Sequence, residues 1–381
     1  MRIVLFLRSL LYGGTERQVV ALACALRRRG HEICVVTLYG GEAFAADLAK
    51  AGIEHRVVGK RGRYDLLVPH WRIAELVREW RADIFYSFLP AQNLAAIVMS
   101  PFLGGAKVVL GVRAAYLDAS QYDGLAGLSY GLEPYVAHFS NLIIANSASG
   151  LRWCMDRGFP SKKLRLVPNG VDTSRFCPDP EARSRLRESL SLGPEKILIA
   201  TICRLDVMKD HPLFLRAAAR LAVLHPEMVF ACVGNGDSAY LAELKRIASG
   251  LNLEDRLLWL PAQENVEAVL NAADICVLPS AHGEGFPNIM VEAMACGTPI
   301  VSTGVGDCAA IADQLLPVVP PGDDEAMAQA VEVTLRRLKL ERGEYRERLR
   351  ERVLRHYSVD VLGATTEALL QGIAAGSRIG I

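Results

Sequence analysis

The segment Asp274–Thr303, DICVLPSAHGEGFPNIMVEAMACGTPIVST, contains the pattern that decides the fold. Its first apolar run, ICVL, predicts a buried strand, and the closing run PIVST predicts a second one. Between them, a glycine-rich loop leads into a helical pattern over about Asn288–Cys296, with Pro287 in its first turn and Gly297 just past its end. A strand, a helix and a strand in this order predict parallel pairing, with helices on the faces of the sheet.

The same alternation of apolar runs and helical patterns continues along the chain. Near the start, IVLFL is followed by a glycine turn, by the helical pattern ERQVVALACALRRRG, which ends at Gly30, and by the run EICVVTL. Further strands are predicted at Ile84–Phe88, Lys107–Gly111 and Leu142–Asn146. A second series starts near Lys196 with ILIATI, VFACVG, LLWL, ICVLPS and PIVST. The sequence therefore predicts two doubly wound α/β halves.

The length supports two domains, because the 381 residues exceed the roughly 250–300 at which single cores stop growing. The Pro-containing break at Cys177–Pro180 marks the predicted join. We expect a first domain over residues 1–177 and a second over 178–355. The segment Tyr345–Ala374 is predicted to be largely helical, and residues from about 356 to 381 are expected to return to the first domain.

Charge is unevenly distributed along a chain whose formal net charge of +1 argues against bulk nucleic-acid binding. Residues 1–176 contain 22 Lys and Arg against 14 Asp and Glu, and residues 177–381 contain 21 against 28. A basic first half suggests an anionic surface or acceptor on that side. Drift among solvated side chains explains the asymmetry equally well.

Cysteine usage and hydropathy predict a cytoplasmic protein. The nine cysteines form no CxxC pair, which fits buried thiols in a reducing compartment. The opening MRIVLFLRSLLYGG is interrupted by Arg8 and predicts a strand rather than a signal peptide. No apolar run is long enough to span a bilayer, so membrane contact is expected to be peripheral, at the inner membrane face.

Ligands of parallel sheets bind beyond the carboxyl ends of the strands, so the loops after strands contain the candidate site. The first such loop, LYGGTERQ, places Gly13 and Gly14 between a strand and a helix. Paired glycines let the backbone approach a phosphate, and the helix N-terminus supplies free N–H groups. An ordinary tight turn explains the same residues. The GxGxxG pattern is absent, so a dinucleotide site is not expected.

Two loops of the second half offer groups for an anion. In ICRLDVMKDH, residues 202–211, Arg204 and Lys209 follow a strand and can grip one anion as a fork and a point charge. A solvated helix start with a salt bridge to an aspartate of the same loop is the alternative. In VGNGD, residues 233–237, Gly234 and Asn235 permit close backbone approach to a ligand, or form a plain turn.

The loop HGEGFPN carries Glu284, and Glu292 follows in the second turn of the predicted helix. Both carboxylates lie near the helix N-terminus and can accept hydrogen bonds from sugar hydroxyls. We also expect the backbone amides of Gly285, Phe286, Pro287 and Asn288 to bind hydroxyl or phosphate oxygens of the donor. His282 is a neighbouring candidate contact. The alternatives are a structural pair of Glu292 with an arginine, and an exposed loop position for Glu284.

The E-x7-E pattern of Glu284 and Glu292 resembles the hallmark of retaining glycosyltransferases of family 4, which have the GT-B fold. The segments GGTER, VPNGVDTSRF at 167–176, RLDVMK at 204–209, VGNGD and LNAADICVLPS match in order, so the resemblance covers nearly the whole chain. It implies two Rossmann-like domains facing a cleft, with the acceptor on the first and the nucleotide sugar on the second. A C-terminal helix would cross back to the first domain.

The resemblance also implies residue roles. Arg204 and Lys209 would neutralise the diphosphate and, with Glu284 holding the donor sugar, form the catalytic set. Glu292 would hold the ribose, Gly14 would offer a backbone N–H to the diphosphate, and the base would lie near LPAQENV at 260–266. Transfer would retain anomeric configuration and need neither a metal nor another cofactor, and the chain has no Asp-x-Asp.

Arg113 is a departure from the family pattern. Many relatives have a histidine after the strand predicted at Lys107–Gly111, where VVLGVRAAYLD offers Arg113. An arginine cannot act as a base at neutral pH, so Arg113 would bind an acceptor phosphate or carboxylate instead. A plain surface arginine is the alternative. Pro261 also replaces a glycine that is common in relatives, so the base-binding loop is expected to differ in detail.

The sequence therefore predicts a metal-independent hexosyltransferase. It would move a sugar from a nucleotide-diphosphate sugar to a hydroxyl of a glycan, lipid-linked or small-molecule acceptor, as in polysaccharide biosynthesis. A sugar-nucleotide epimerase or hydrolase on the same fold is one alternative. A non-catalytic nucleotide-sugar binder is another, although the joint presence of Arg204, Lys209, Glu284 and Glu292 argues against it.

Overall fold

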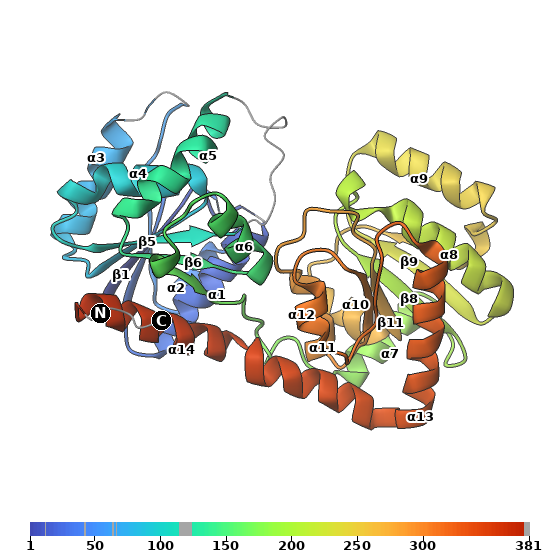
Figure 1. Cartoon of the computed structure of the whole chain (residues 1–381). Helices are drawn as coiled ribbons and strands as arrows, with labels where there is room; N and C mark the ends of the chain where they lie inside the picture. The colour runs from blue at the N-terminus through green and yellow to red at the C-terminus, as the bar shows by residue number, and fades with distance from the viewer. Residues whose placement is uncertain (12, 42, 63–64, 66, 114–123, 377–381) are drawn as a thin grey trace. The chain divides into compact units, whose positions relative to one another are not determined.

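The computed structural model describes residues 1–11, 13–41, 43–62, 65, 67–113 and 124–376. It contains two compact units (Figure 1). The first unit consists of Met1–Gly170 together with Val359–Ile381, and the second consists of Val171–Ser358. The first crossing of the chain between units thus falls a few residues before Cys177–Pro180.

A seven-stranded parallel sheet forms the centre of the first unit. Its spatial order is β3 (Glu54–Val57), β2 (Glu32–Thr37), β1 (Arg2–Leu7), β4 (Ile84–Phe88), β5 (Lys107–Val112), β6 (Leu142–Ala145) and β7 (Leu164–Leu166). The central strands are almost wholly buried, as parallel sheets covered on both faces require. The edge strands β3 and β7 were not predicted, because EHRV and LRL are short and interrupted by charged residues.

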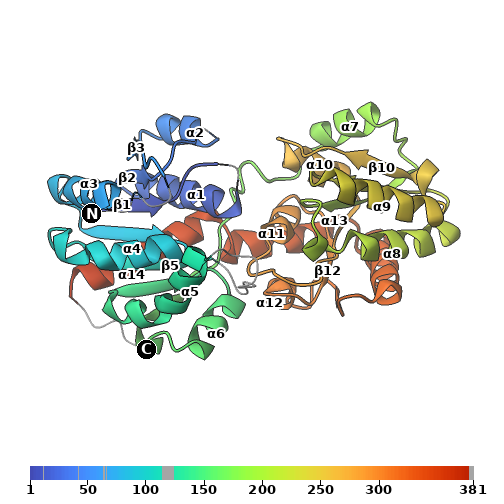
Figure 2. The ribbon, with the colours of Figure 1, turned by 90° about the horizontal axis from the view of Figure 1, so that it is seen from above.

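Helices cover both faces of this sheet. On one face lie α1 (Gly14–Arg28), α2 (Ala45–Lys50) and α14 (Val359–Ala374). On the other lie α3 (Leu67–Glu79), α4 (Pro90–Met99) and α6 (Ala148–Asp156). α5 (Gly124–Val136) packs against α4, and Figures 1 and 2 both show α3, α4 and α5 side by side.

The second unit repeats this architecture with six parallel strands. Their order is β10 (Leu257–Leu260), β9 (Met228–Val233), β8 (Ile197–Ile202), β11 (Ile275–Leu278), β12 (Ile300–Thr303) and β13 (Val318–Val319). One face is covered by α8 (His211–Leu224) and α9 (Ser238–Gly250), the other by α7 (Pro180–Ser189), α10 (Val266–Ala272), α11 (Asn288–Ala295) and α12 (Cys308–Ala312). Two doubly wound α/β units confirm the predicted fold class.

The long helix α13 (Asp324–His356) contributes side chains to the cores on both faces of the second sheet. Its first half contributes Met327 and Val331 to the core beside α8, and its second half contributes Leu349 and Val353 to the core beneath α11. The sequence placed the start of helical structure near Tyr345. The helix begins earlier because the Asp323 side chain accepts a hydrogen bond from the Ala326 N–H at 2.9 Å and caps it.

The C-terminal helix α14 returns to the first unit, as predicted. The Glu367 carboxylate accepts a hydrogen bond from Arg29 Nε at 2.5 Å, and its other oxygen lies 2.8 Å from His31 Nε2. These two contacts anchor α14 to the end of α1. Gly363 permits the close approach, because a Cβ there would lie 2.8 Å from the Ala25 Cβ. Among the described residues, none of the helices combines the length and apolar character needed to cross a bilayer.

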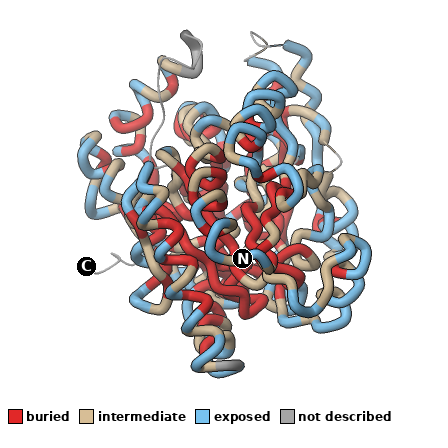
Figure 3. Tube along the Cα trace, turned by 90° about the vertical axis from the view of Figure 1, so that its right-hand side faces the viewer, coloured by how far each residue is buried: buried red, intermediate tan, exposed pale blue. Residues whose placement is uncertain are grey.

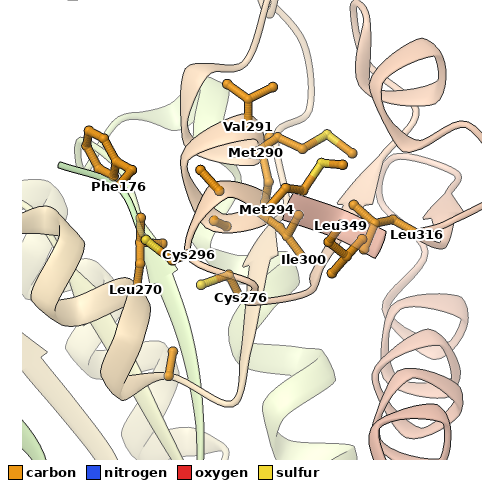
Figure 4. Close-up of a cluster of buried hydrophobic side chains, with 14 of the residues drawn as sticks. Phe176, Leu270, Cys276, Met290, Val291, Met294, Cys296, Ile300, Leu316 and Leu349 are labelled. Atoms are coloured by element: carbon orange, nitrogen blue, oxygen red, sulfur yellow. The ribbon is translucent and has the colours of Figure 1, made fainter. Parts of the chain in front are cut away.

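Burial is concentrated along the strands and the inner sides of the helices (Figure 3). Beneath α11, the side chains of Met290 and Met294 pack against Cys276 of β11, Ile300 of β12 and Leu349 of α13 (Figure 4). This core holds α11 on the second sheet and thereby fixes the position of the loop that precedes it.

Candidate active site

Three loops meet at the carboxyl edge of the second sheet. They are residues 203–210 after β8, 234–237 after β9 and 279–287 after β11. The Leu205 N–H donates to the Asn235 carbonyl at 2.9 Å, and the Ala281 N–H donates to the Met208 carbonyl at 2.9 Å. The segments that the sequence singled out therefore form one connected surface.

Lys209 and Glu284 form an ion pair on this surface, between Nζ and Oε1. The Ser280 hydroxyl donates to the same carboxylate oxygen at 2.7 Å, and Thr303 Oγ1 donates to the Ser280 carbonyl at 2.6 Å. The side chains of Lys209 and Glu284 are only 17% and 9% exposed, so water and salt screen the pair weakly. The structure thus brings together two of the three residues predicted to be catalytic.

Two aspartates fix the position of Lys209. Asp206 accepts a hydrogen bond from the Met208 N–H at 3.1 Å and starts the short helix η5 (Val207–Lys209). Asp210, in the left-handed region at φ 42°, accepts from the Leu213 N–H at 3.1 Å and starts α8. Lys209 therefore stands between two capped turns, which hold its backbone in place.

Arg204 does not join the Lys209–Glu284 pair in this structure. Its guanidinium forms an ion pair with Asp206 at 3.0 Å, and its side chain is 66% exposed. This is the salt bridge that the sequence left open as the alternative. Exposed pairs of this kind contribute only about 0–1 kcal/mol, so little free energy opposes the movement of Arg204 toward an anionic ligand.

Gly234 and Asn235 connect the loops. A Cβ at Gly234 would lie 2.0 Å from the Cys203 carbonyl oxygen, so the contact that requires glycine is with the neighbouring loop. Asn235 Oδ1 accepts from the Ala262 N–H at 2.9 Å and thereby holds the 260–266 segment. The predicted reason for this glycine was close approach to a ligand, and the structure supplies a second, internal reason.

The Gly-Glu-Gly loop is held by its neighbours on two sides. Gly283 has φ +80°, and a Cβ there would lie 2.5 Å from the Met208 methyl group. Gly306, at φ +61°, passes so close that a Cβ would lie 2.4 Å from the Glu284 carbonyl oxygen. The Asp307 N–H donates to the Gly285 carbonyl at 3.0 Å. The direction of the Glu284 side chain is therefore set by backbone packing.

At the start of α11 the structure refines the expected donor groups. Pro287 is the N-cap rather than a residue of the first turn, and as a proline it has no N–H to offer, so it cannot contribute a backbone donor. The Phe286 ring is buried in the core and lies edge-on to Tyr357 at 5.6 Å. Gly285 and Phe286 therefore offer backbone N–H groups in the loop before α11, and Asn288 is the first residue of the helix.

Glu292 lies in the second turn of α11 and is only 4% exposed. Its backbone carbonyl accepts from the Cys296 N–H at 3.2 Å, and Gly297 follows at φ +71° as the expected helix stop. His282, by contrast, is exposed in the loop before Glu284. The two glutamates thus occupy different environments, a loop surface and a helix interior.

His211, which sequence reasoning did not single out, is fully buried directly behind Lys209. Its Nε2 lies 3.4 Å from Cys203 Sγ, and its Nδ1 has no hydrogen-bond partner in the described structure. Burial, reinforced by the Lys209 charge, lowers the pKa of His211 to about 4. The neutral ring fills space without adding a second positive charge. Its position directly after Lys209-Asp210, at the start of a helix, was the available signal.

In the first unit, Gly13 and Gly14 open α1 as predicted. Gly13 is the N-cap in an extended conformation, its carbonyl accepts from the Arg17 N–H at 3.1 Å, and Gly14 is exposed as the first helical residue. Tyr12 of the same loop lies outside the described residues. The first turn of α1 thus follows the carboxyl end of β1, where ligands of parallel sheets bind.

Arg113 follows β5 and is not a plain surface arginine. Its Nη1 donates to Asn169 Oδ1 at 2.8 Å, and its guanidinium lies 5.0 Å above the Phe88 ring. Burial lowers the pKa of Arg113, and Tyr86 opposes this shift. Its Nε is buried without a hydrogen-bond partner among the residues that the structure describes. Residues 114–123, which follow it, lie outside the described part.

Asn169 is a second residue that the sequence did not assign a role. It belongs to the VPNGV segment, whose glycine is fixed by Gln18 of α1. The Gln18 side chain donates to the Gly170 carbonyl at 2.9 Å and accepts from its N–H at 3.0 Å. This reciprocal pair places Asn169 against Arg113, an arrangement that no spacing in the sequence indicates.

No group of three or more His, Cys, Asp or Glu side chains among the described residues could hold a metal ion.

Comparisons with known proteins identify the family. Residues 12–175 match the family described as Glycosyltransferase Family 4, and residues 196–337 match the one described as Glycosyl transferases group 1. The chain therefore belongs to the group 1 and family 4 glycosyltransferases, which confirms the resemblance seen in its motifs.

Two curated relatives illustrate this membership. A D-inositol 3-phosphate glycosyltransferase of Geodermatophilus obscurus is 30% identical over 78% of this chain and 64% of its own length. A GDP-mannose-dependent alpha-(1-6)-phosphatidylinositol monomannoside mannosyltransferase of Mycolicibacterium smegmatis is 36% identical over 38% of this chain and 39% of its own. The chain thus spans less than two thirds of the length of these relatives.

Solved structures support the GT-B fold. HepE of Anabaena in complex with UDP aligns at a TM-score of 0.85 and 20% identity, covering 98% of this chain and all of that one. A glycosyltransferase of Rickettsia africae aligns at 0.85 and 18% identity over 99% of both chains. At these identities, the likeness establishes the fold alone.

Gly234→Ala tests the loop geometry. The new methyl group would overlap the Cys203 carbonyl, so we expect the second unit to lose more than about 2 kcal/mol of unfolding free energy. Hydrogen exchange of the β8–β10 amides measures the loss. Gly250→Ala at the end of α9, where a Cβ meets no atom within 4 Å, is the control and should be neutral or stabilising. Equal behaviour of the two variants would contradict the geometry.

Proposed function

We propose that the chain is a retaining hexosyltransferase that moves a sugar from a nucleotide-diphosphate sugar to an acceptor hydroxyl. The acceptor would be a glycan, a lipid-linked glycan or a small molecule, and the reaction would need no metal. The Lys209–Glu284 ion pair, weakly exposed and held by Ser280 at the carboxyl edge of the second sheet, is the observation that carries the proposal. The lysine can bind a diphosphate, and the carboxylate beside it can accept hydrogen bonds from sugar hydroxyls. A ligand that contains both groups therefore fits this pair.

The proposed chemistry follows from these charges. As the bond between sugar and phosphate breaks, negative charge grows on the departing diphosphate. Lys209 would stabilise that charge from a fixed, weakly solvated position, together with Arg204 once it has left its ion pair with Asp206. Glu284 would accept hydrogen bonds from the hydroxyls of the donor sugar and Glu292 from the ribose. The backbone N–H of Gly285 would bind a further oxygen of the donor.

The second unit would accordingly be the nucleotide-sugar domain and the first unit the acceptor domain. Arg113 supports an acceptor that bears a phosphate or carboxylate, because its Nε is buried without a described partner and guanidinium groups bind such anions as a fork. The names of the two relatives fit this idea, since D-inositol 3-phosphate and phosphatidylinositol both contain phosphate. We place the protein in the cytoplasm with peripheral contact at the membrane.

An epimerase or hydrolase on the same fold, or a non-catalytic binder, is distinguished by acceptor dependence. An epimerase or hydrolase would consume the donor without an acceptor. A binder would consume it under neither condition. A transferase requires both substrates for product formation beyond slow hydrolysis.

Lys209→Ala tests the donor site. Nucleoside diphosphates and UDP-, GDP-, ADP- and TDP-sugars are screened for a thermal shift, and a ligand at a hundred times its Kd adds about 2.7 kcal/mol. We expect one base to stabilise the wild type and Lys209→Ala to lose that shift together with about 10²–10³-fold in kcat. Lys245→Ala on the exposed side of α9 is the matched control. Unchanged turnover in Lys209→Ala, or no shift with any donor, would sink the proposal.

Arg113→Ala tests the acceptor. With the donor from that screen, we compare D-inositol 3-phosphate with unphosphorylated inositol, and a lipid-linked phosphate sugar with its dephosphorylated form. Loss of one charged hydrogen bond, about 1.5–3 kcal/mol, predicts a roughly 10–100-fold drop in kcat/KM for the phosphorylated acceptor only. Donor thermal shifts should not change, and Arg152→Ala on α6 serves as control. An equal drop for both acceptors would show that Arg113 has no part in anion recognition.

A further inference from the structure

We propose that a cationic pocket and the apolar face beside it dock the first unit on an anionic lipid bilayer, with a lipid phosphate in the pocket. The pocket lies at the amino ends of β4 and β5, on the sheet edge opposite to Arg113. The proposal deepens the membrane contact of the proposed function and rests on it for the cellular setting only. Lipid binding itself needs neither donor nor acceptor.

The pocket has a volume of about 330 Å³. It is lined by the α3–β4 and η1–β5 connections, where η1 is Ser100–Phe102, and by Ala374 at the end of α14. Three cations line it, Arg78, Arg81 and Lys107. Within the described part of the chain, none of their side chains has an ion-pair or hydrogen-bond partner. The lining carboxylate, Asp83, is already engaged, since its Oδ2 accepts from the Arg2 N–H at 2.7 Å. The excess positive charge suits a phosphate.

An exposed aromatic pair lies along the same seam between α3 and η1. The rings of Trp71 and Phe102 lie 5.9 Å apart, and both side chains are more than half exposed. Arg78 follows Trp71 by two helical turns on the same side of α3. Next to Phe102, the turn at Gly104 lies against Arg78, because a Cβ there would be 3.3 Å from the Arg78 Cγ. The aromatic pair and the pocket therefore adjoin.

A second exposed apolar stretch lies on α5, which packs against α4 on the same face of the sheet. Leu128, Leu132, Tyr135 and Phe139 are all exposed and follow one another at helical spacing, with Phe139 in the short helix η3 (Ala137–Phe139). Among the described side chains of residues 127–139, no exposed one is a Lys, Arg, Asp or Glu, because Glu133 is buried. Single exposed apolar residues are ordinary on protein surfaces, but an uncharged helix face of this length is not.

These segments belong to one side of the first unit. α3, α4 and α5 lie next to one another in both views (Figures 1 and 2). Basic residues flank the apolar stripe as well. Lys163 Nζ donates to the carbonyls of His138 and Ser140 at 2.7 and 2.6 Å, which places Lys163 and its exposed neighbour Lys162 at the end of the stripe.

Charge complementarity favours an anionic bilayer over a second copy of the chain. The residues assigned to the first unit contain 22 Lys and Arg against 15 Asp and Glu, a net charge of +7. In a two-fold dimer the same patch would face itself, so cations would meet cations. A bilayer of anionic lipids offers phosphates to the pocket and an interfacial region in which Trp, Tyr and Phe side chains are favoured.

Vesicle sedimentation of the full chain tests the proposal. The probes are vesicles of phosphatidylcholine and phosphatidylglycerol in equimolar amounts, and vesicles of phosphatidylcholine alone. We expect binding to the anionic vesicles that weakens with added salt. Arg81→Gln with Lys107→Gln should weaken it about 30-fold, since each cation near the surface contributes about fivefold. Phe102→Ser with Tyr135→Ser should weaken it about tenfold.

Matched controls separate this surface from general effects. Lys245→Gln and Val223→Ser change an exposed cation and an exposed apolar side chain of the second unit and should leave vesicle binding unchanged. The thermal shift with the nucleotide-sugar donor should be the same in all variants. If the donor shift is absent while vesicle binding follows the prediction, the proposed function fails and the docking surface stands.

Three results would overturn the docking surface. One is equal binding of wild type and both double variants to anionic vesicles. Another is binding of inorganic phosphate to the pocket in solution while the chain binds no vesicles, which would assign the pocket to a soluble anion. The third is a dimer in light scattering that the Phe102 and Tyr135 changes dissociate, which would assign the apolar face to a second copy of the chain.

Discussion

The candidate site depends on one ion pair, between Lys209 and Glu284. It connects the loop after β8 to the loop after β11, which are adjacent strands of the second sheet. Burying two charges is favourable only when each has good partners, and here Ser280 donates to the same carboxylate while two capping aspartates hold the lysine backbone. The packing of α11, the close passage of Gly306 and the neutral His211 all serve to keep these two charges in place.

Much of the fold could be predicted from the sequence because the buried strands of a parallel sheet are near-continuous apolar runs. The strands β4, β8 and β10 have the predicted limits, since each is a compact apolar run bounded by turn residues. The edge strands β3, β7 and β13 gave no such signal, because a strand exposed along one side needs few apolar residues. The start of α13 was missed because Asp323 was not recognised as its N-cap.

The site could be predicted only in part. Residue types and loop positions made Lys209 and Glu284 candidates, since ligands bind beyond the carboxyl ends of the strands, and the family resemblance assigned them to one site. The structure alone reveals what depends on contacts between distant segments. Examples are the Arg204–Asp206 pair, the contact of Arg113 with Asn169, and the approach of Gly234 to Cys203. Pro287 was included among the amide donors although proline has no N–H, an error that its chemistry could have prevented.

The first unit has cationic groups at both ends of its sheet, and we assign a different kind of anion to each end. Arg113 stands at the carboxyl end, half buried and held by Asn169, where a fork of fixed geometry suits a specific acceptor. Arg78, Arg81 and Lys107, which have no ion-pair partner among the described residues, stand at the amino end beside exposed aromatic rings. A site that recognises one group needs such fixed geometry, whereas a surface that adheres to many lipids needs mainly charge and apolar area.

The most direct test of the central claim is a crystal structure of the chain with a nucleoside diphosphate bound. We expect diphosphate oxygens within hydrogen-bonding distance of Lys209 Nζ, with the Arg204 guanidinium turned from Asp206 toward the same phosphates. We also expect the ribose hydroxyls beside Glu292. A nucleotide bound elsewhere, with the Lys209–Glu284 pair and Arg204 as they are in the unliganded chain, would contradict that claim.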